Sequence, residues 1–132
     1  ADEGLVHGMS NAAMGADTIC NCCSCCCLFF ESQKVLQLSG LQSSNYYVAI
    51  DEETCTGCGL CIERCPADAL ELVDEVSHLK SKSLCLGCGV CVYKCPTEAM
   101  GLVKREQEQL VPERMRDAAF LMLRQDGHEI PS

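Results

Sequence analysis

The chain has 132 residues, a formal net charge of −9 at pH 7 and 14 cysteines. This length allows one compact domain with appendages, and the acidic balance argues against binding to nucleic acid, which needs basic patches. So many cysteines are typical either of a secreted disulfide scaffold or of metal binding in a reducing compartment. Residues 1–8 lack the features of a secretory signal, and the most apolar stretch, residues 19–30, is too short to span a membrane. We therefore expect a cytoplasmic protein with no membrane span.

Residues 1–44 are predicted to form a cysteine-rich N-terminal extension. Its first 18 residues are polar without a sustained pattern, and a short helix is expected over Glu31–Leu38. Between them stand six thiols within eight residues: Cys20, Cys22, Cys23, Cys25, Cys26 and Cys27. One hypothesis is a third metal site, either an iron–sulfur cluster or a thiolate-bound zinc ion. The other is a packed or oxidised segment that holds no metal, and the sequence leaves both open.

Residues 45–104 contain an internal repeat. When residues 55–73 are superimposed on residues 85–103, ten of the nineteen positions are identical. Duplication of this length predicts two copies of one unit, packed about a pseudo-twofold axis, each with a strand, a cysteine loop, a short helix and a second strand. Tyr46–Ile50 is expected to be the first strand. Pro66 and Pro96 are expected to begin the short helices, because proline is favoured in a first helical turn.

Each copy of the repeat carries the cysteine pattern C-x2-C-x2-C-x3-C-P. The first runs from Cys55 to Pro66 and the second from Cys85 to Pro96. This spacing holds 4Fe-4S clusters in bacterial ferredoxins, and the glycines between the cysteines permit close approach of the backbone. Zinc ribbons use C-x2-C pairs instead, so two zinc sites fit the pattern poorly. We expect two 4Fe-4S clusters and, because such clusters oxidise readily, an anaerobic source.

On these two motifs, residues 45–104 resemble the bacterial-type dicluster ferredoxin domain. The resemblance implies an α+β, ferredoxin-like βαββαβ fold with two low-potential one-electron centres and no substrate chemistry of its own. In two-cluster ferredoxins the cysteine before proline binds the other cluster. The expected ligands are therefore crossed: Cys55, Cys58, Cys61 and Cys95 for cluster 1, and Cys85, Cys88, Cys91 and Cys65 for cluster 2.

Residues 105–132 are predicted to be a C-terminal helical tail. Met115, Ala118, Ala119, Met122 and Leu123 fall on one face of a helix, and Gly127 is a plausible end for it. We expect this helix to pack on the domain or on a neighbouring subunit.

The N-terminal part carries a second resemblance. The segment Gly4-Leu5-Val6-His7 and the run from Ile19 to Cys27, followed by a dicluster domain, are similar to the C-terminal region of larger 4Fe-4S binding proteins of anaerobes with a CNCCxCCC motif. The resemblance, and a chain that starts at Ala1, imply that an upstream part of the same polypeptide is among its partners.

The function expected from these features is electron transfer, without enzymatic activity of its own, in a larger redox protein. The acidic charge, which two clusters would bring to about −13, suits docking on a basic face of a redox partner. The alternative is a reductase domain, in which the residues from Cys20 to Cys27 form a further cluster or a thiol active site supplied with electrons by the ferredoxin part.

Overall fold

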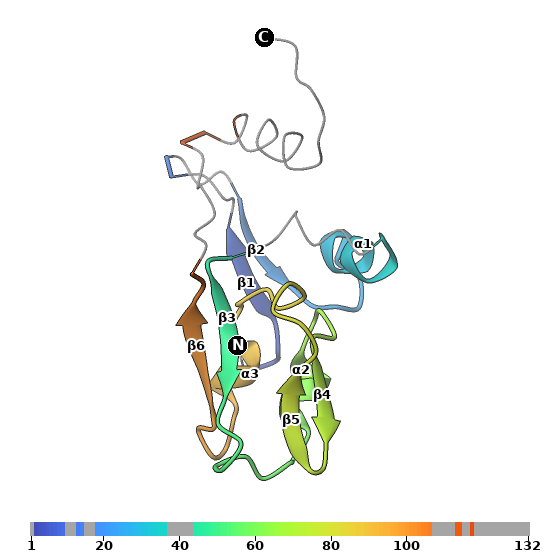
Figure 1. Cartoon of the computed structure of the whole chain (residues 1–132). Helices are drawn as coiled ribbons and strands as arrows, with labels where there is room; N and C mark the ends of the chain where they lie inside the picture. The colour runs from blue at the N-terminus through green and yellow to red at the C-terminus, as the bar shows by residue number, and fades with distance from the viewer. Residues whose placement is uncertain are drawn as a thin grey trace.

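The computed structural model describes residues 2–9, 13–14, 18–36, 44–106, 113–114 and 117. Over these residues the fold is α+β, with short antiparallel sheets and short helices (Figure 1). No helix in the described part of the chain is long and apolar enough to cross a membrane. The helix expected in the C-terminal tail lies outside the described residues, apart from isolated positions.

The repeat region follows the order β3 (Tyr46–Ile50), α2 (Leu60–Arg64), β4 (Leu70–Val73), β5 (Val76–Leu79), α3 (Val90–Tyr93) and β6 (Met100–Lys104). Strand β3 pairs with β6, and β4 pairs with β5, both antiparallel. Pairing of the first strand with the last closes the two halves on each other. The expected strand Tyr46–Ile50 is confirmed.

The short helices begin earlier than the sequence predicts. They lie between the second and fourth cysteines of each motif, and the expected starts at Pro66 and Pro96 are wrong. A residue before proline is driven out of the helical region, and Cys65 is accordingly extended, with φ −71° and ψ 110°. After each proline, Asp68 and Glu98 have φ of 51° and 54°, which a helix does not allow.

A hairpin in the N-terminal extension was not expected from the sequence. Strand β1 (Val6–Met9) pairs antiparallel with β2 (Ile19–Cys22), with Val6 opposite Cys22. The helix expected over Glu31–Leu38 is α1, Leu28–Leu36, so it starts three residues earlier; Leu38 lies outside the described residues. Alternation of polar and apolar residues is weak in both strands, so no local pattern predicts the pairing.

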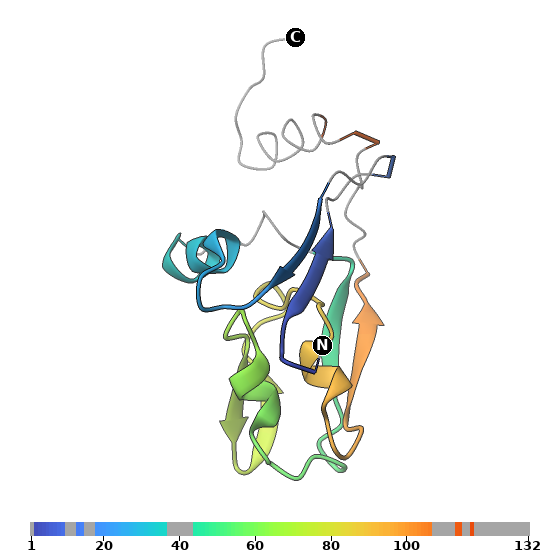
Figure 2. The ribbon, with the colours of Figure 1, turned by 180° about the vertical axis from the view of Figure 1, so that it is seen from behind.

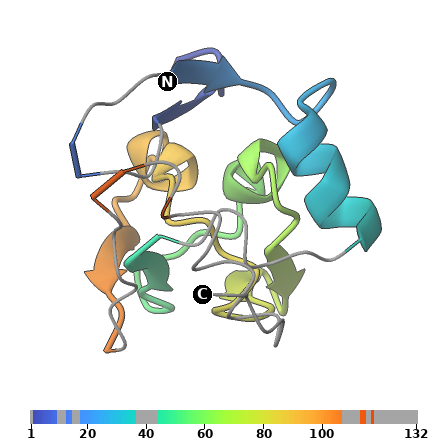
Figure 3. The same ribbon diagram turned by 90° about the horizontal axis from the view of Figure 1, so that it is seen from above.

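The hairpin lies on the side of α2 and α3, which pack side by side (Figures 2 and 3). Asp2 connects it to both helices: its carboxylate lies 2.7 Å from the ammonium of Lys94, and its carbonyl oxygen accepts a hydrogen bond of 2.8 Å from Arg64. Arg64 and Lys94 occupy equivalent positions in the two motifs. The extension is therefore held against both halves of the repeat at once.

Among the residues that the structure describes, the core is small and is built largely around the cysteines. Val48, Ala69 and Leu70 are almost fully buried, and Cys61 and Cys85 belong to the same buried cluster. Apolar burial of this extent is modest for a domain of this size, so ligands bound by the thiols would contribute much of the stability of the fold.

Candidate metal centres

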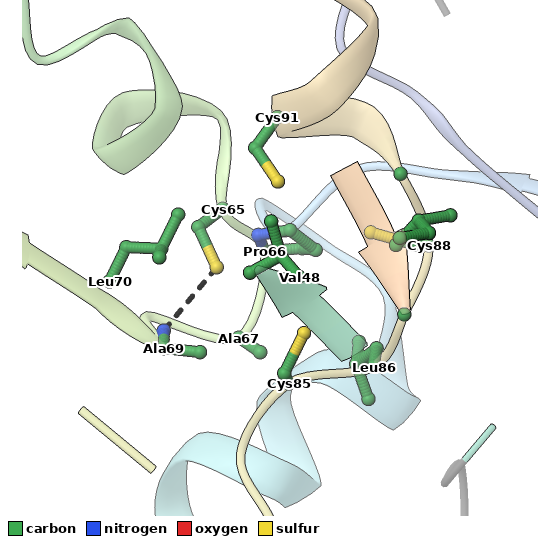
Figure 4. Close-up of a pocket in the computed structure, with 13 residues that line it drawn as sticks. Val48, Cys65, Pro66, Ala67, Ala69, Leu70, Cys85, Leu86, Cys88 and Cys91 are labelled. Atoms are coloured by element: carbon green, nitrogen blue, oxygen red, sulfur yellow. Dashed lines mark hydrogen bonds between the residues drawn. The ribbon is translucent and has the colours of Figure 1, made fainter. Parts of the chain in front are cut away.

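Four thiols from the two motifs surround one cavity, which we call the Cys85 cavity. Its walls include Cys85, Cys88 and Cys91 from the second motif and Cys65 from the first. Figure 4 shows these four side chains around one space, together with Val48 and Ala67. Apart from the cysteines the described lining is apolar, because the loop and strands β3, β4 and β6 present aliphatic side chains there.

The other four thiols of the repeat surround a second cavity, the Cys55 cavity. Cys55, Cys58 and Cys61 come from the first motif and Cys95 from the second. Each cavity thus combines three cysteines of one loop with the last cysteine of the other. The Cys55 cavity is closer to solvent, because Cys58 is exposed whereas the most exposed thiols of the Cys85 cavity are only half-buried.

The tight turn in each loop depends on a glycine. Gly57 and Gly87 have φ of +67° and +64°, a region that costs other residues strain. A side chain would also collide with neighbouring backbone, that of Glu75 beside Gly57 and that of Tyr46 beside Gly87. Glycine at these positions lets each loop lie close to other backbone, the turn between β4 and β5 beside Gly57 and strand β3 beside Gly87, and the three thiols of the loop then line one cavity.

The thiols of the Cys85 cavity hold their protons strongly. Burial raises the pKa of Cys65 and of Cys88, and it raises the pKa of Cys91 to about 12, with further increases from neighbouring thiols. For Cys65 the backbone N–H of Ala69, 3.3 Å from Sγ, opposes this effect. Metal binding at this cavity must therefore displace several protons, as is usual for thiolate ligands.

Two hydroxyl groups distinguish the Cys55 cavity. The Ser77 Oγ lies 3.2 Å from the Sγ of Cys61, and the Thr97 Oγ1 lies 3.7 Å from the Sγ of Cys95. Burial tends to raise the pKa of Cys95, but hydrogen bonds from the Thr97 hydroxyl and from nearby backbone N–H groups outweigh it, so the pKa is lowered. Because a thiolate has no proton to give, both hydroxyls must donate once the sulfurs bind metal.

The Cys85 cavity has no counterpart to either hydroxyl in its described lining. The Cys85 cavity is lined by Val48 of strand β3, whereas the Cys55 cavity is lined by Ser77 of strand β5. Ala67, in the Cys85 cavity, occupies the position in the repeat that Thr97 occupies in the Cys55 cavity. Sequence reasoning missed both residues. The Ala67–Thr97 difference was visible within the repeat, whereas nothing in the sequence marked Ser77, which is 1% exposed, as a neighbour of a ligand.

The six N-terminal cysteines line neither cavity: Cys20 and Cys22 lie in β2, and the other four lie between β2 and α1. Cys22 and Cys27 pack against the core, and a hydrogen bond with Cys27 raises the pKa of Cys22 to about 11. Burial would raise the pKa of Cys27, but backbone N–H groups of Phe30 and Phe29 at the start of α1 lower it overall. In the turn that precedes Cys27, Cys23 and Cys25 are joined by a disulfide.

Comparison with known proteins agrees with this geometry. Residues 49–102 match the family described as 4Fe-4S dicluster domain. A segment of 33 residues, 25% of the chain, is 48% identical to the mitochondrial pyruvate dehydrogenase [NADP(+)] of Euglena gracilis, of which it covers 2%. The chain thus contains a dicluster ferredoxin segment whose cofactors are 4Fe-4S clusters, and two sets of four converging thiols fit such cofactors.

Proposed function

We propose that this chain, which carries a 4Fe-4S dicluster domain, transfers electrons through two clusters with crossed ligands. Cys55, Cys58, Cys61 and Cys95 would hold cluster 1, and Cys85, Cys88, Cys91 and Cys65 would hold cluster 2. The observation that carries the proposal is the composition of the two cavities, each with three thiols of one motif and the last thiol of the other. When bound, each cluster supplies low-potential one-electron chemistry.

We further propose that residues 45–104 form a ferredoxin-like βαββαβ domain with a pseudo-twofold axis, flanked by the extension 1–44 and the tail 105–132. The order of strands and helices agrees with this fold. So do paired conformations in the two halves: Gly59 and Gly89 both precede their helix with φ of 75°, and Asp68 and Glu98 both have positive φ.

The residues around the two cavities would make the centres unequal. In the Cys55 cavity, hydrogen bonds from Ser77 and Thr97 stabilise the additional negative charge that reduction places on the sulfurs. Exposure of Cys58 acts in the same direction. The Cys55 cavity would therefore hold the centre of higher potential, and its exposed side is the shorter route for exchange with a partner.

Two surface properties support exchange with other protein surfaces. The net charge of −9 favours association with the basic face of a redox partner. On the N-terminal extension, Ile19, Leu28 and Val35 are 78%, 81% and 73% exposed. Leu28 and Val35 are seven residues apart in α1 and so lie on one face of the helix, and an exposed apolar helix face supports a place for this chain in a larger redox protein.

Electron exchange with a basic protein tests the proposal. The anaerobically prepared chain is photoreduced and mixed with cytochrome c, a basic one-electron acceptor, in a stopped-flow spectrophotometer. We expect one cytochrome to be reduced per reduced centre, with a second-order rate constant that falls as ionic strength rises. Iron-loaded protein that reduces no cytochrome would refute electron transfer, and a rate independent of salt would refute docking through the acidic surface.

A further inference from the structure

The six cysteines of β2 and of the connection from β2 to α1 divide into two groups of three. Cys20, Cys22 and Cys27 form the inner group: Cys22 interacts with both of the others, and Cys22 and Cys27 pack against the core. The outer group is formed by Cys23, Cys25 and Cys26 in the turn that joins β2 to α1, and the last two are exposed. Neither group lines the cavities of the ferredoxin segment.

The outer group gathers three sulfur atoms in one turn, two of them joined as a disulfide, so opening that bond would leave three neighbouring thiols for one metal ion. Its three Sγ atoms all lie within 4.8 Å of one another. The Sγ of Cys26 is 3.8 Å from that of Cys23 and 3.7 Å from that of Cys25. A tetrahedral ion with metal–sulfur bonds of about 2.3 Å holds its thiolates about 3.8 Å apart. In a 4Fe-4S cluster each thiolate binds a different iron, which sets the thiolates farther apart than this.

We propose that Cys23, Cys25 and Cys26 bind a single soft divalent ion, Zn²⁺ or Fe²⁺, as three thiolates, separately from the two 4Fe-4S clusters. Thiolates select such ions, and three protein ligands leave the fourth position of a tetrahedral ion open. Exposure of Cys25 and Cys26 places that position at the surface, within reach of water or an added ligand. The inference does not rest on electron transfer by the clusters.

The disulfide between Cys23 and Cys25 makes this site dependent on redox state. With the bond closed, two of the three ligands cannot bind metal. A two-electron reductant opens it: with a phosphine and water, the S–S bond breaks, two thiols form and the phosphine becomes its oxide. The three thiols then release three protons to the buffer as they bind the ion. A small-molecule disulfide would close the bond again by thiol–disulfide exchange, itself reduced to two thiols, and this would expel the metal; renewed reduction would restore the site.

Native mass spectrometry of the iron-loaded chain tests the proposal. The protein is prepared anaerobically, treated with tris(2-carboxyethyl)phosphine, desalted, and given one equivalent of Zn²⁺ or Fe²⁺. We expect about one additional ion per chain, with the mass of the two clusters unchanged. Without the phosphine, the disulfide form should retain none. Cys26→Ser should weaken retention by at least roughly 10–100-fold, the loss that even outer partners of a metal site produce.

Cys20→Ser is the matched control, because Cys20 lies in the same segment but belongs to the inner group; it should retain the ion. Cys25→Ser provides a second variant if Cys26→Ser fails to fold, which loss of cluster iron would reveal. Retention unaffected by both outer variants would overturn the proposal, as would the mass of a third 4Fe-4S cluster or no added ion after reduction. Absence of cluster iron in the unaltered chain would instead refute the proposed electron carrier.

Discussion

The hydroxyl of Ser77 should raise the reduction potential of the cluster in the Cys55 cavity. Ser77 is 1% exposed, and its Oγ lies 3.2 Å from the Sγ of Cys61. Reduction adds negative charge to the cluster and its sulfurs, so a donor at this distance stabilises the reduced form more than the oxidised form. Replacement by alanine removes the donor while adding no bulk to the cavity.

The size of the effect follows from the strength of such a bond. A hydrogen bond to a charged group contributes about 1.5–3 kcal/mol, of which we assign about 1 kcal/mol to the difference between oxidation states. For a one-electron couple this corresponds to about 40 mV, since 59 mV is a factor of ten in the equilibrium constant. Ser77→Ala should therefore lower the potential of one cluster by about 40 mV. Thr97→Ala should lower it less, because its contact with Cys95 is 3.7 Å.

An anaerobic redox titration followed by electron paramagnetic resonance measures both potentials in one sample. Only one of the two waves should move, and it should be the wave of higher potential. Ser32→Ala is the matched control, because the Ser32 hydroxyl donates to the Phe29 carbonyl oxygen at 2.9 Å in α1 and lines neither cavity. If Ser77→Ala shifted neither wave, shifted both equally, or raised the potential, the reasoning from the hydroxyl would be refuted.

Three further predictions address the ligands, the loops and the extension. Cys65→Ala should remove the cluster in the Cys85 cavity and leave the one in the Cys55 cavity. The potential of the remaining cluster should therefore still fall when Ser77→Ala is added, and a potential that does not change would contradict crossed ligation. Gly87→Ala should destabilise the domain by about 2 kcal/mol or more, from positive φ and collision with backbone, in thermal unfolding followed by circular dichroism; Gly101→Ala, which meets nothing within 4 Å, should cost less, and equal losses would refute the argument. Asp2→Asn should speed amide hydrogen exchange in β1 without changing iron content. The hydrogen bond and the charge of Lys94 lower the pKa of Asp2, so in the unaltered chain the Asp2–Lys94 contact should be fully formed above the ordinary pKa of Asp and be lost as pH falls through the lowered pKa of Asp2. Amide exchange in β1 that is the same in Asp2→Asn as in the unaltered chain would contradict a docking role for Asp2.

Much of the metal chemistry could be predicted from spacing, because ligand spacing in a cluster loop is short-range information. The strand Tyr46–Ile50 was equally predictable from its β-branched and aromatic residues. The positions of the short helices do not follow from the sequence, because Pro66 suits a helix start as well as a helix end, and only the backbone of Cys65 decides between them.

Long-range contacts could not be predicted in the same way. The pairing of β1 with β2 joins segments separated by residues 10–18, a connection longer than the tight turns by which a hairpin is predicted. It is stabilised partly by Asp2 against Arg64 and Lys94, residues far along the chain. The position of Ser77 beside Cys61 depends on how β5 packs against the first cysteine loop, which no local pattern encodes.

Electron uptake by the iron-loaded chain tests the central claim most directly. In an anaerobic coulometric titration of protein whose iron and sulfide have been counted, two 4Fe-4S clusters predict about eight iron and eight sulfide per chain and two electrons taken up singly, in two waves of unequal potential. The account would be contradicted if metal-loaded protein took up no electrons. It would also be contradicted if the protein contained no sulfide and one zinc ion for every four cysteines.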